Sequence, residues 1–97
     1  MRQLADLAGI GKAMLEDFRL LGVSSVDQLA GCNARQLYNE LCERTGQRQD
    51  PCVYDVFRCA IEQAKNPRLA EEKRKWWYWS RVRKQRGELL QPNVIAT

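Results

Sequence analysis

Apolar side chains recur at three- and four-residue steps along most of the chain, the spacing that places them on one face of an α-helix. The clearest run follows Asp50 and Pro51. An aspartate is a favoured helix N-cap, and proline is favoured at the first helical position. The run therefore predicts a helix with a broad apolar face that lies across the core. Its apolar positions are Val53, Val56, Phe57, Ala60, Ile61 and Ala64.

Upstream, glycines divide the apolar pattern into short segments. Leu4 and Leu7 suggest a short first helix, which a tight turn at residues 8–11 should end, because glycine adopts backbone angles closed to other residues. A second helix is expected over about residues 12–21, with Gly22 suited to a left-handed C-cap. The side chains expected on its inward face are Leu15, Phe18 and Leu21.

Capping residues mark the next two helices. Ser25 with Gln28 three residues later reads as a capping box that opens a brief third helix. Asn33 is a good N-cap for a fourth helix that ends near residues 45–46. One face of this helix is expected to carry Leu37, Tyr38, Leu41 and Cys42. No stretch shows the alternation of a strand, so the predicted class is all-α.

The C-terminal third is polar and rich in tryptophan. Asn66 and Pro67 repeat the cap-and-proline pattern, which predicts a sixth helix from there to about Arg86, before a loose end containing Pro92. On such a helix several large apolar residues fall in one arc, which favours docking onto the fourth and fifth helices. The alternative is that the rings stack on exposed bases. The residues in question are Leu69, Trp76, Trp77 and, at the edge of the arc, Trp79.

The order of these elements indicates two helix-hairpin-helix units back to back. The expected fold is a SAM-like, pseudo-duplicated five-helix core over residues 1–66, on which residues 67–97 dock as a basic, Trp-rich C-terminal helix and tail. Only the first hairpin has its glycines. The second, at residues 46–49, would be degenerate, because Pro51 removes an amide that such a turn offers to an anion.

The first hairpin turn carries the candidate chemistry. Gly9 and Gly11 allow a tight bend, while Ile10 is expected to fill the gap between the helices and leave the surrounding amides facing outward. Those amides lie at a helix N-terminus, where free donors and the helix dipole attract an anion such as a phosphate. Lys12 adds a positive charge. DNA phosphates are the expected ligand, although hairpins of this kind also dock proteins, and the acidic residues at 16 and 17 would oppose a polyanion.

Several segments together resemble a known bacterial family. They are residues 11–14 (GKAM), 16–23 (EDFRLLGV), 25–29 (SVDQL), 50–58 (DPCVYDVFR) and 76–79 (WWYW). These segments resemble the small pathogenicity-locus proteins, also called mitomycin-resistance proteins, over most of residues 4–84, and the hairpin is similar to the C-terminal domain of the competence regulator TfoX. The resemblance implies a helix-hairpin-helix fold and DNA binding linked to DNA repair, competence or DNA-damage resistance. Leu15 and Phe18 stand where alanine and leucine are usual.

Charge is distributed unevenly along the chain. The net charge of +4 combines −1 over residues 1–66 with +5 over residues 67–97. A basic tail on a near-neutral domain favours a polyanionic partner, although it also serves solubility. The expected additional DNA contacts are Arg48, Arg74, Lys75, Arg81, Arg83 and Lys84, the last five together with Arg86 forming a solvated basic rim.

Catalytic, metal and cofactor sites are not expected. The chain has no histidine, and its cysteines show no C-x-x-C pair, so neither structural zinc nor acid-base catalysis has an obvious carrier. Cys52 follows a helix start that would lower its pKa and make it reactive, or it is a core-facing thiol like the others. A cytoplasmic protein without membrane spans is expected, with DNA as partner and a protein partner or homodimer as the alternative. The four expected thiols are Cys32, Cys42, Cys52 and Cys59.

Overall fold

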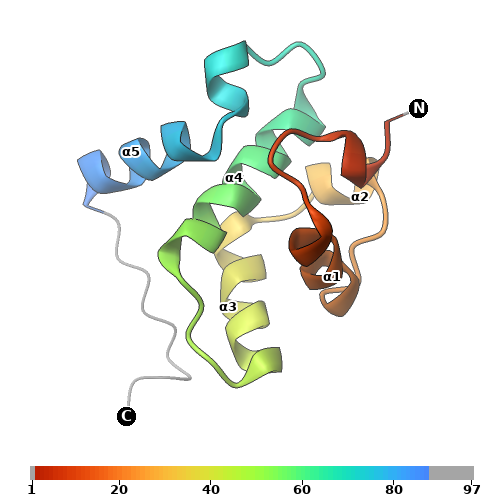
Figure 1. The fold of residues 1–97 in the computed structure, drawn as a ribbon, viewed down its shortest axis with the longest axis vertical. Coiled ribbons are helices and arrows are strands. Elements are labelled where there is room, and N and C mark those ends of the chain that lie inside the picture. The colour runs from red at the N-terminus through yellow and green to blue at the C-terminus, as the bar shows by residue number, and fades with distance from the viewer. Residues whose placement is uncertain (1, 88–97) are drawn as a thin grey trace.

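The computed structural model describes residues 2–87, and within them every helix or strand assigned is a helix, which confirms the all-α prediction. Figure 1 shows α4 running through the middle of the molecule, with α1 and α2 on one side and α5 on the other. The predicted loose end containing Pro92 lies outside the described residues. The elements are the 3-10 turn η1 Leu4–Asp6, α1 Lys12–Leu20, α2 Val26–Ala30, α3 Ala34–Thr45, α4 Pro51–Lys65, the 3-10 turn η2 Glu71–Arg74 and α5 Trp76–Arg86.

The central position of α4 follows from its broad apolar face. Phe57 is fully buried, and its ring centroid lies 5.6 Å from that of Phe18 in α1. The two rings therefore bring α1 and α4 into contact in the core. The helix packs against α2, α3 and α5. The prediction that this helix lies across the core is therefore confirmed. The fully or nearly fully buried apolar side chains that surround it include Leu29, Leu41, Tyr38 and Cys42.

The predicted caps define the helix starts. The side chain of Asp50 accepts a hydrogen bond from the amide of Cys52 at 2.8 Å, and the side chain of Asn33 caps α3 by accepting from the amide of Gln36 at 3.0 Å. Ser25 accepts from the amide of Gln28 at 3.0 Å, as a capping box requires. The reciprocal bond is shifted by one residue, because the Gln28 side chain accepts from the amide of Ser24 instead.

The predicted helix from Pro67 to Arg86 is wrong in its first half. The side chain of Asn66 accepts from the amide of Arg68 at 2.9 Å and closes a turn. Buried Leu69 then brings the chain back toward the core, and α5 begins only at Trp76. The break leaves the carbonyl of residue 73 to accept the indole N–H of Trp79 at 2.8 Å. An unbroken helix would use that carbonyl for its own ladder.

The late start of α5 changes the phase of the tryptophans. The Trp79 side chain is 9% exposed and is buried against the rest of the fold, as is that of Leu69. Trp76 and Trp77 are 37% and 47% exposed, so the prediction that they dock is wrong. The division of the chain at residue 66 stays a prediction. No helix within residues 2–87 is long and apolar enough to cross a bilayer.

Candidate nucleic-acid interface

The turn between η1 and α1 is anchored on its inner side and open on its outer side. Leu7 is buried, and Ile10 is half-buried against the core, as its predicted plugging role requires. Gly9 has φ of +84°, a left-handed conformation that strains any residue with a Cβ. Gly11 is the N-cap of α1 in an extended conformation. A Cβ at either glycine would meet nothing within 4 Å, so the outer face of the turn is open space.

A side chain from α4 fixes this turn. The Gln63 side chain accepts a hydrogen bond from the amide of Ala8 at 2.9 Å and donates one to the Ala8 carbonyl at 3.1 Å. Gln63 is only 5% exposed, so both of its polar atoms need such partners. The guanidinium of Arg2 also reaches the main-chain carbonyl of Gln63, at 2.8 Å. The turn is therefore held by α4, the longest helix within residues 2–87.

The main-chain amides of the turn divide into used and available donors. The amide of Ile10 donates to the carbonyl of Leu7 at 3.3 Å, and α1's first intrahelical bond runs from Leu15 to Gly11 at 3.0 Å. Among residues 2–87, no acceptor meets the amides of a group of four exposed residues. These are Gly9, Gly11, Lys12 and Ala13. They lie where the positive end of the α1 dipole adds to their attraction for an anion.

The acidic residues of α1 are partly neutralised. Both carboxylate oxygens of Glu16 accept hydrogen bonds from the guanidinium of Arg19, and these bonds hold the pKa of Glu16 below its usual range. Partial burial raises the pKa of Asp17, and the neighbouring Glu16 charge adds to that rise. Lys12 is exposed at the start of the helix. The repulsion expected from Glu16 is therefore offset by its own arginine.

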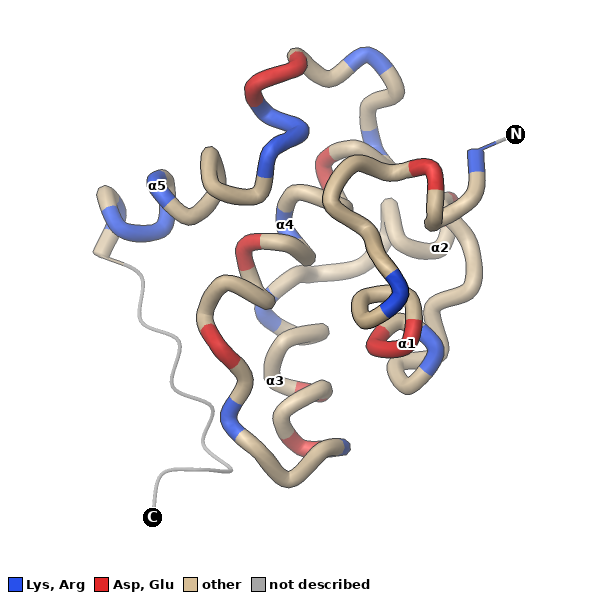
Figure 2. The backbone as a smooth tube through the Cα atoms, viewed as in Figure 1, with Lys and Arg blue, Asp and Glu red and all other residues tan. Residues whose placement is uncertain are grey.

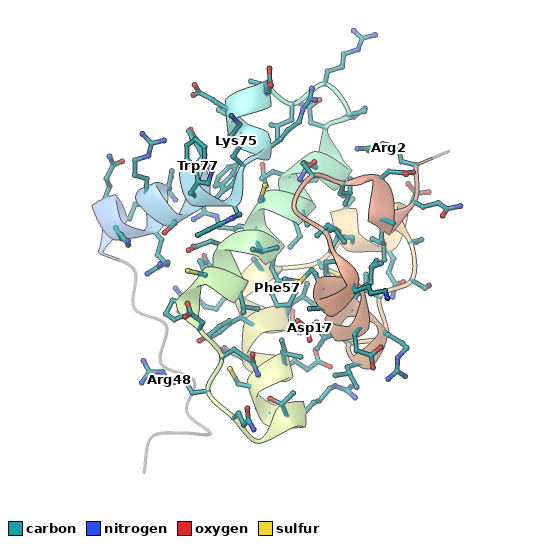
Figure 3. The ribbon with its side chains drawn as sticks, in the orientation of Figure 1. Arg2, Asp17, Arg48, Phe57, Lys75 and Trp77 are labelled. Atoms are coloured by element: carbon teal, nitrogen blue, oxygen red, sulfur yellow. The ribbon has the colours of Figure 1, made fainter. Side chains whose placement is uncertain are left out.

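The remaining predicted contact residues do not form one continuous patch with the turn. Figure 2 shows that the basic residues of α5 lie across α4 from α1. Figure 3 places Lys75, the N-cap residue of α5, beside Trp77, and Arg48 on the separate loop between α3 and α4. The Lys75 ammonium lies 5.2 Å from the Trp77 ring centroid, and the Arg81 guanidinium lies 5.6 Å from it. Lys84 and Arg74 are exposed, the latter with its Nε donating to the carbonyl of residue 69.

Arg83 is not part of a solvated rim, so that prediction is wrong. Its guanidinium donates to both carboxylate oxygens of Asp55, which is fully buried in α4. The side chain of Arg83 is itself only 13% exposed. No local pattern indicates this pair, because its partners are 28 residues apart and Asp55 lies beside an otherwise apolar face.

The cysteines are thiols that differ in burial. Cys42 and Cys59 are buried, whereas Cys32 and Cys52 are half-buried. Burial raises the pKa of the Cys52 thiol, and a hydrogen bond and negative charge from Asp50 raise it further, which favours an unactivated thiol over the alternative of a reactive one. Among residues 2–87, no three histidine, cysteine or acidic side chains gather as a metal site would require.

The chain matches known sequences over most of its length. Residues 1–85 match the model of a family described as "Pathogenicity locus". A relative from Streptomyces lavendulae, "Mitomycin resistance protein McrB", is 30% identical over 81 residues, which cover 84% of this chain and 73% of the relative. No solved structure matches the chain.

Proposed function

The chain belongs to the pathogenicity-locus family, and from that premise we propose that it is a non-catalytic protein that grips the phosphate backbone of DNA without reading base sequence. In this proposal, residues 7–12 form the turn of a helix-hairpin-helix unit like that of the TfoX C-terminal domain. The relative is named for mitomycin resistance, which agrees with a role in DNA-damage resistance, repair or competence.

The available amides of the turn carry the proposal. Phosphate oxygens are strong acceptors, and several donors that converge at a helix N-terminus match them in charge and direction. Lys12 adds a mobile cation at the same place. Because the Gln63 side chain holds Ala8 from behind, the donors need little reorganisation when an anion arrives.

Binding through this turn would be independent of base sequence. Main-chain amides and a lysine contact phosphates, and such contacts position a protein on a duplex without distinguishing base pairs. Three exposed cations at or near α5, namely Lys75 at its N-cap, Arg81 and Lys84, would add long-range attraction from across α4 rather than share one phosphate with the turn. Arg83 has no part in this proposal, because Asp55 holds its guanidinium.

A salt-dependent anisotropy titration with a labelled duplex tests the proposal. The key variant is Gly11→Asp: its extended backbone suits an N-cap aspartate, which would bond the available amides itself and place an anion at the phosphate seat. The matched control is Gln47→Asp, which makes the same charge change on the exposed loop between α3 and α4. Lys84→Gln measures the contribution of α5.

We expect the native protein to lose affinity as salt rises, with a log–log slope of roughly 0.9 per phosphate neutralised. Gly11→Asp should abolish binding while α1 gains a few tenths of a kcal/mol in stability, because aspartate is a better N-cap than glycine. Gln47→Asp should bind nearly as the native protein does. Native-like binding by a folded Gly11→Asp variant, or no native binding at low salt, would contradict the proposal.

A second candidate function is docking onto a protein partner or a second copy of the chain. Three large apolar side chains that remain exposed favour it, namely Leu20 at 37%, Trp76 at 37% and Trp77 at 47%. Sedimentation at increasing protein concentration, for the native chain and for Trp77→Ser, tests self-association. Pull-down that persists after nuclease treatment, and that Trp77→Ser removes, would identify a protein partner.

A further inference from the structure

One face of α5 carries an exposed tryptophan and a row of cations. Residues three and four positions apart are neighbours on a helix surface, so Trp77, Arg81 and Lys84 form one row along α5. All three are exposed, and Lys75, the N-cap of the helix, is exposed beside them. Figure 3 shows Trp77 and Lys75 next to each other at the start of α5. These four residues form the α5 stripe.

A different face of α5 holds the helix on α4 and leaves the stripe outside. Trp79 is buried, and its indole N–H donates to the carbonyl of residue 73 at 2.8 Å. Arg83 is paired with buried Asp55 of α4. These contacts fix the rotation of α5 about its axis, so the stripe is held on the outer side. The hairpin turn lies across α4 from α5, and the two surfaces can therefore be altered separately.

The Trp77 ring has cations beside it and still remains open to solvent. The Lys75 ammonium lies 5.2 Å from the ring centroid and the Arg81 guanidinium 5.6 Å from it. With both cations in place, Trp77 is 47% exposed. A cation beside a ring keeps its full charge. Lys84, the fourth member of the stripe, has no ion-pair partner within residues 2–87.

The charge around the stripe favours a polyanion as its occupant. Residues 73–86 contain seven basic side chains and no acidic one. A second copy of the chain that docked through the same face would bring these like charges together, which disfavours self-association at this place. A duplex offers phosphates but keeps the faces of its bases stacked inside. An unpaired strand offers phosphates together with open base faces, which match an exposed indole among cations.

We propose that the α5 stripe binds single-stranded DNA, with an unpaired base stacked on the open part of the Trp77 ring and phosphates near the three cations. Stacking on an aromatic ring tolerates any base, because every base has a flat π-face. The phosphates are attracted by the charge of the cations, so no hydrogen-bond donor has to leave a partner. The choice of DNA rests on the proposed function of the turn, whereas the stacking does not.

Two measurements with oligothymidine test this proposal. Anisotropy of a labelled oligomer gives the affinity, and tryptophan emission reports stacking, because a base stacked on an indole quenches it. The control ligand is an abasic oligomer of the same length, which keeps the phosphates and lacks the bases. Trp77→Ala removes the ring, and Trp77→Phe keeps a smaller one. Lys12→Gln, at the turn, is the matched control for Lys84→Gln in the stripe.

We expect oligothymidine to quench the native protein and to bind more tightly than the abasic oligomer. Trp77→Ala should weaken oligothymidine binding by about fivefold or more, the effect of losing one stacked base, and leave the affinity for the abasic oligomer nearly unchanged. Trp77→Phe should keep most of the affinity and lose the quenching. Lys84→Gln should lower the log–log salt slope by about 0.7, and Lys12→Gln should leave it unchanged.

Several results would overturn the proposal. They are no binding of oligothymidine at low salt, equal affinity for the abasic oligomer, native-like affinity in a folded Trp77→Ala variant, and native-like quenching in Trp77→Phe. Self-association that Trp77→Ser abolishes, without any binding of oligothymidine, would assign the stripe to protein docking instead.

Two variants separate this proposal from that for the turn. Gly11→Asp should abolish duplex binding and leave oligothymidine binding intact. Trp77→Ala should weaken oligothymidine binding and leave duplex binding nearly unchanged. Failure of one proposal is thus distinguishable from failure of the other.

Discussion

The Nε of Arg83 lies 2.9 Å from Oδ1 of Asp55, and its Nη2 lies 3.1 Å from Oδ2, so a two-point ion pair joins α5 to α4. Asp55 is fully buried, and its partner comes from the last helix of the described chain. The pair satisfies a carboxylate that would otherwise have no compensating charge in the interior. It therefore fixes α5 on α4.

Removing one member of this pair should strongly destabilise the protein. Arg83→Met leaves the Asp55 carboxylate buried and uncompensated, and we expect the free energy of unfolding in urea to fall by about 3–5 kcal/mol. The double variant Asp55→Leu, Arg83→Met removes both charges and should recover most of that loss. A loss in the double variant as large as in Arg83→Met would show that the cost comes from packing rather than from the unpaired charge.

Two tryptophans of the same helix should differ sharply in their contribution to stability. Trp79→Ala removes a docked ring and its bond to the carbonyl of Lys73, and we expect a loss of about 3–5 kcal/mol. Trp77→Ala removes a half-exposed ring flanked by cations and should cost less than about 1 kcal/mol. Thermal unfolding followed by circular dichroism gives the comparison. Equal losses would contradict the placement of α5.

The two glycines of the turn provide a matched pair for backbone strain. Gly9→Ala puts a Cβ on a residue with φ of +84° and should cost about 1–2 kcal/mol, although the space around it is open. Gly11→Ala has an extended backbone and equal space, so it adds no backbone strain and should lower the unfolding free energy by only about 0.5–1 kcal/mol, because alanine is a poorer N-cap than glycine. Chemical denaturation of both variants measures the difference, and a reversed order would exclude this turn conformation.

Cys59 should make the stability of the protein depend on pH in the alkaline range. Burial raises the pKa of its thiol from 9.0 to about 11. The folded state holds this proton more tightly than the unfolded state, so the stabilisation is complete below pH 9 and is lost as pH rises through 11. The free energy of unfolding should fall over this window in the native chain and fall less in Cys59→Ala. Parallel curves for the two proteins would contradict this prediction.

The parts of the fold that sequence predicted well depend on neighbouring residues. Asp50 signals a helix start because its side chain accepts from the amide two residues later, and Pro51 is favoured at the first helical position. The apolar run after them identifies the core face of α4. The cap of α3 by Asn33 is equally local. Such features follow from spacing alone, which is why their positions could be predicted closely.

The parts that could not be predicted depend on partners distant in sequence. Gln63 meets Ala8 across 55 residues, and neither residue type reveals the other. Arg83 lies in the same basic stretch of sequence as its solvated neighbours. Only the rotational position of α5 directs its side chain toward Asp55. That phase is set by the break before Trp76, which depends on where Leu69 and Trp79 find space against the core.

The side-chain amide of Gln63 imitates a peptide group of a neighbouring strand, since it offers one donor and one acceptor to the backbone of Ala8. The turn at residues 8–11 should therefore open together with α4, rather than separately as a terminal segment does. A ligand bound on the outer side of that turn should therefore also stabilise α4. Amide hydrogen exchange in this central helix should then be slower when the ligand is bound.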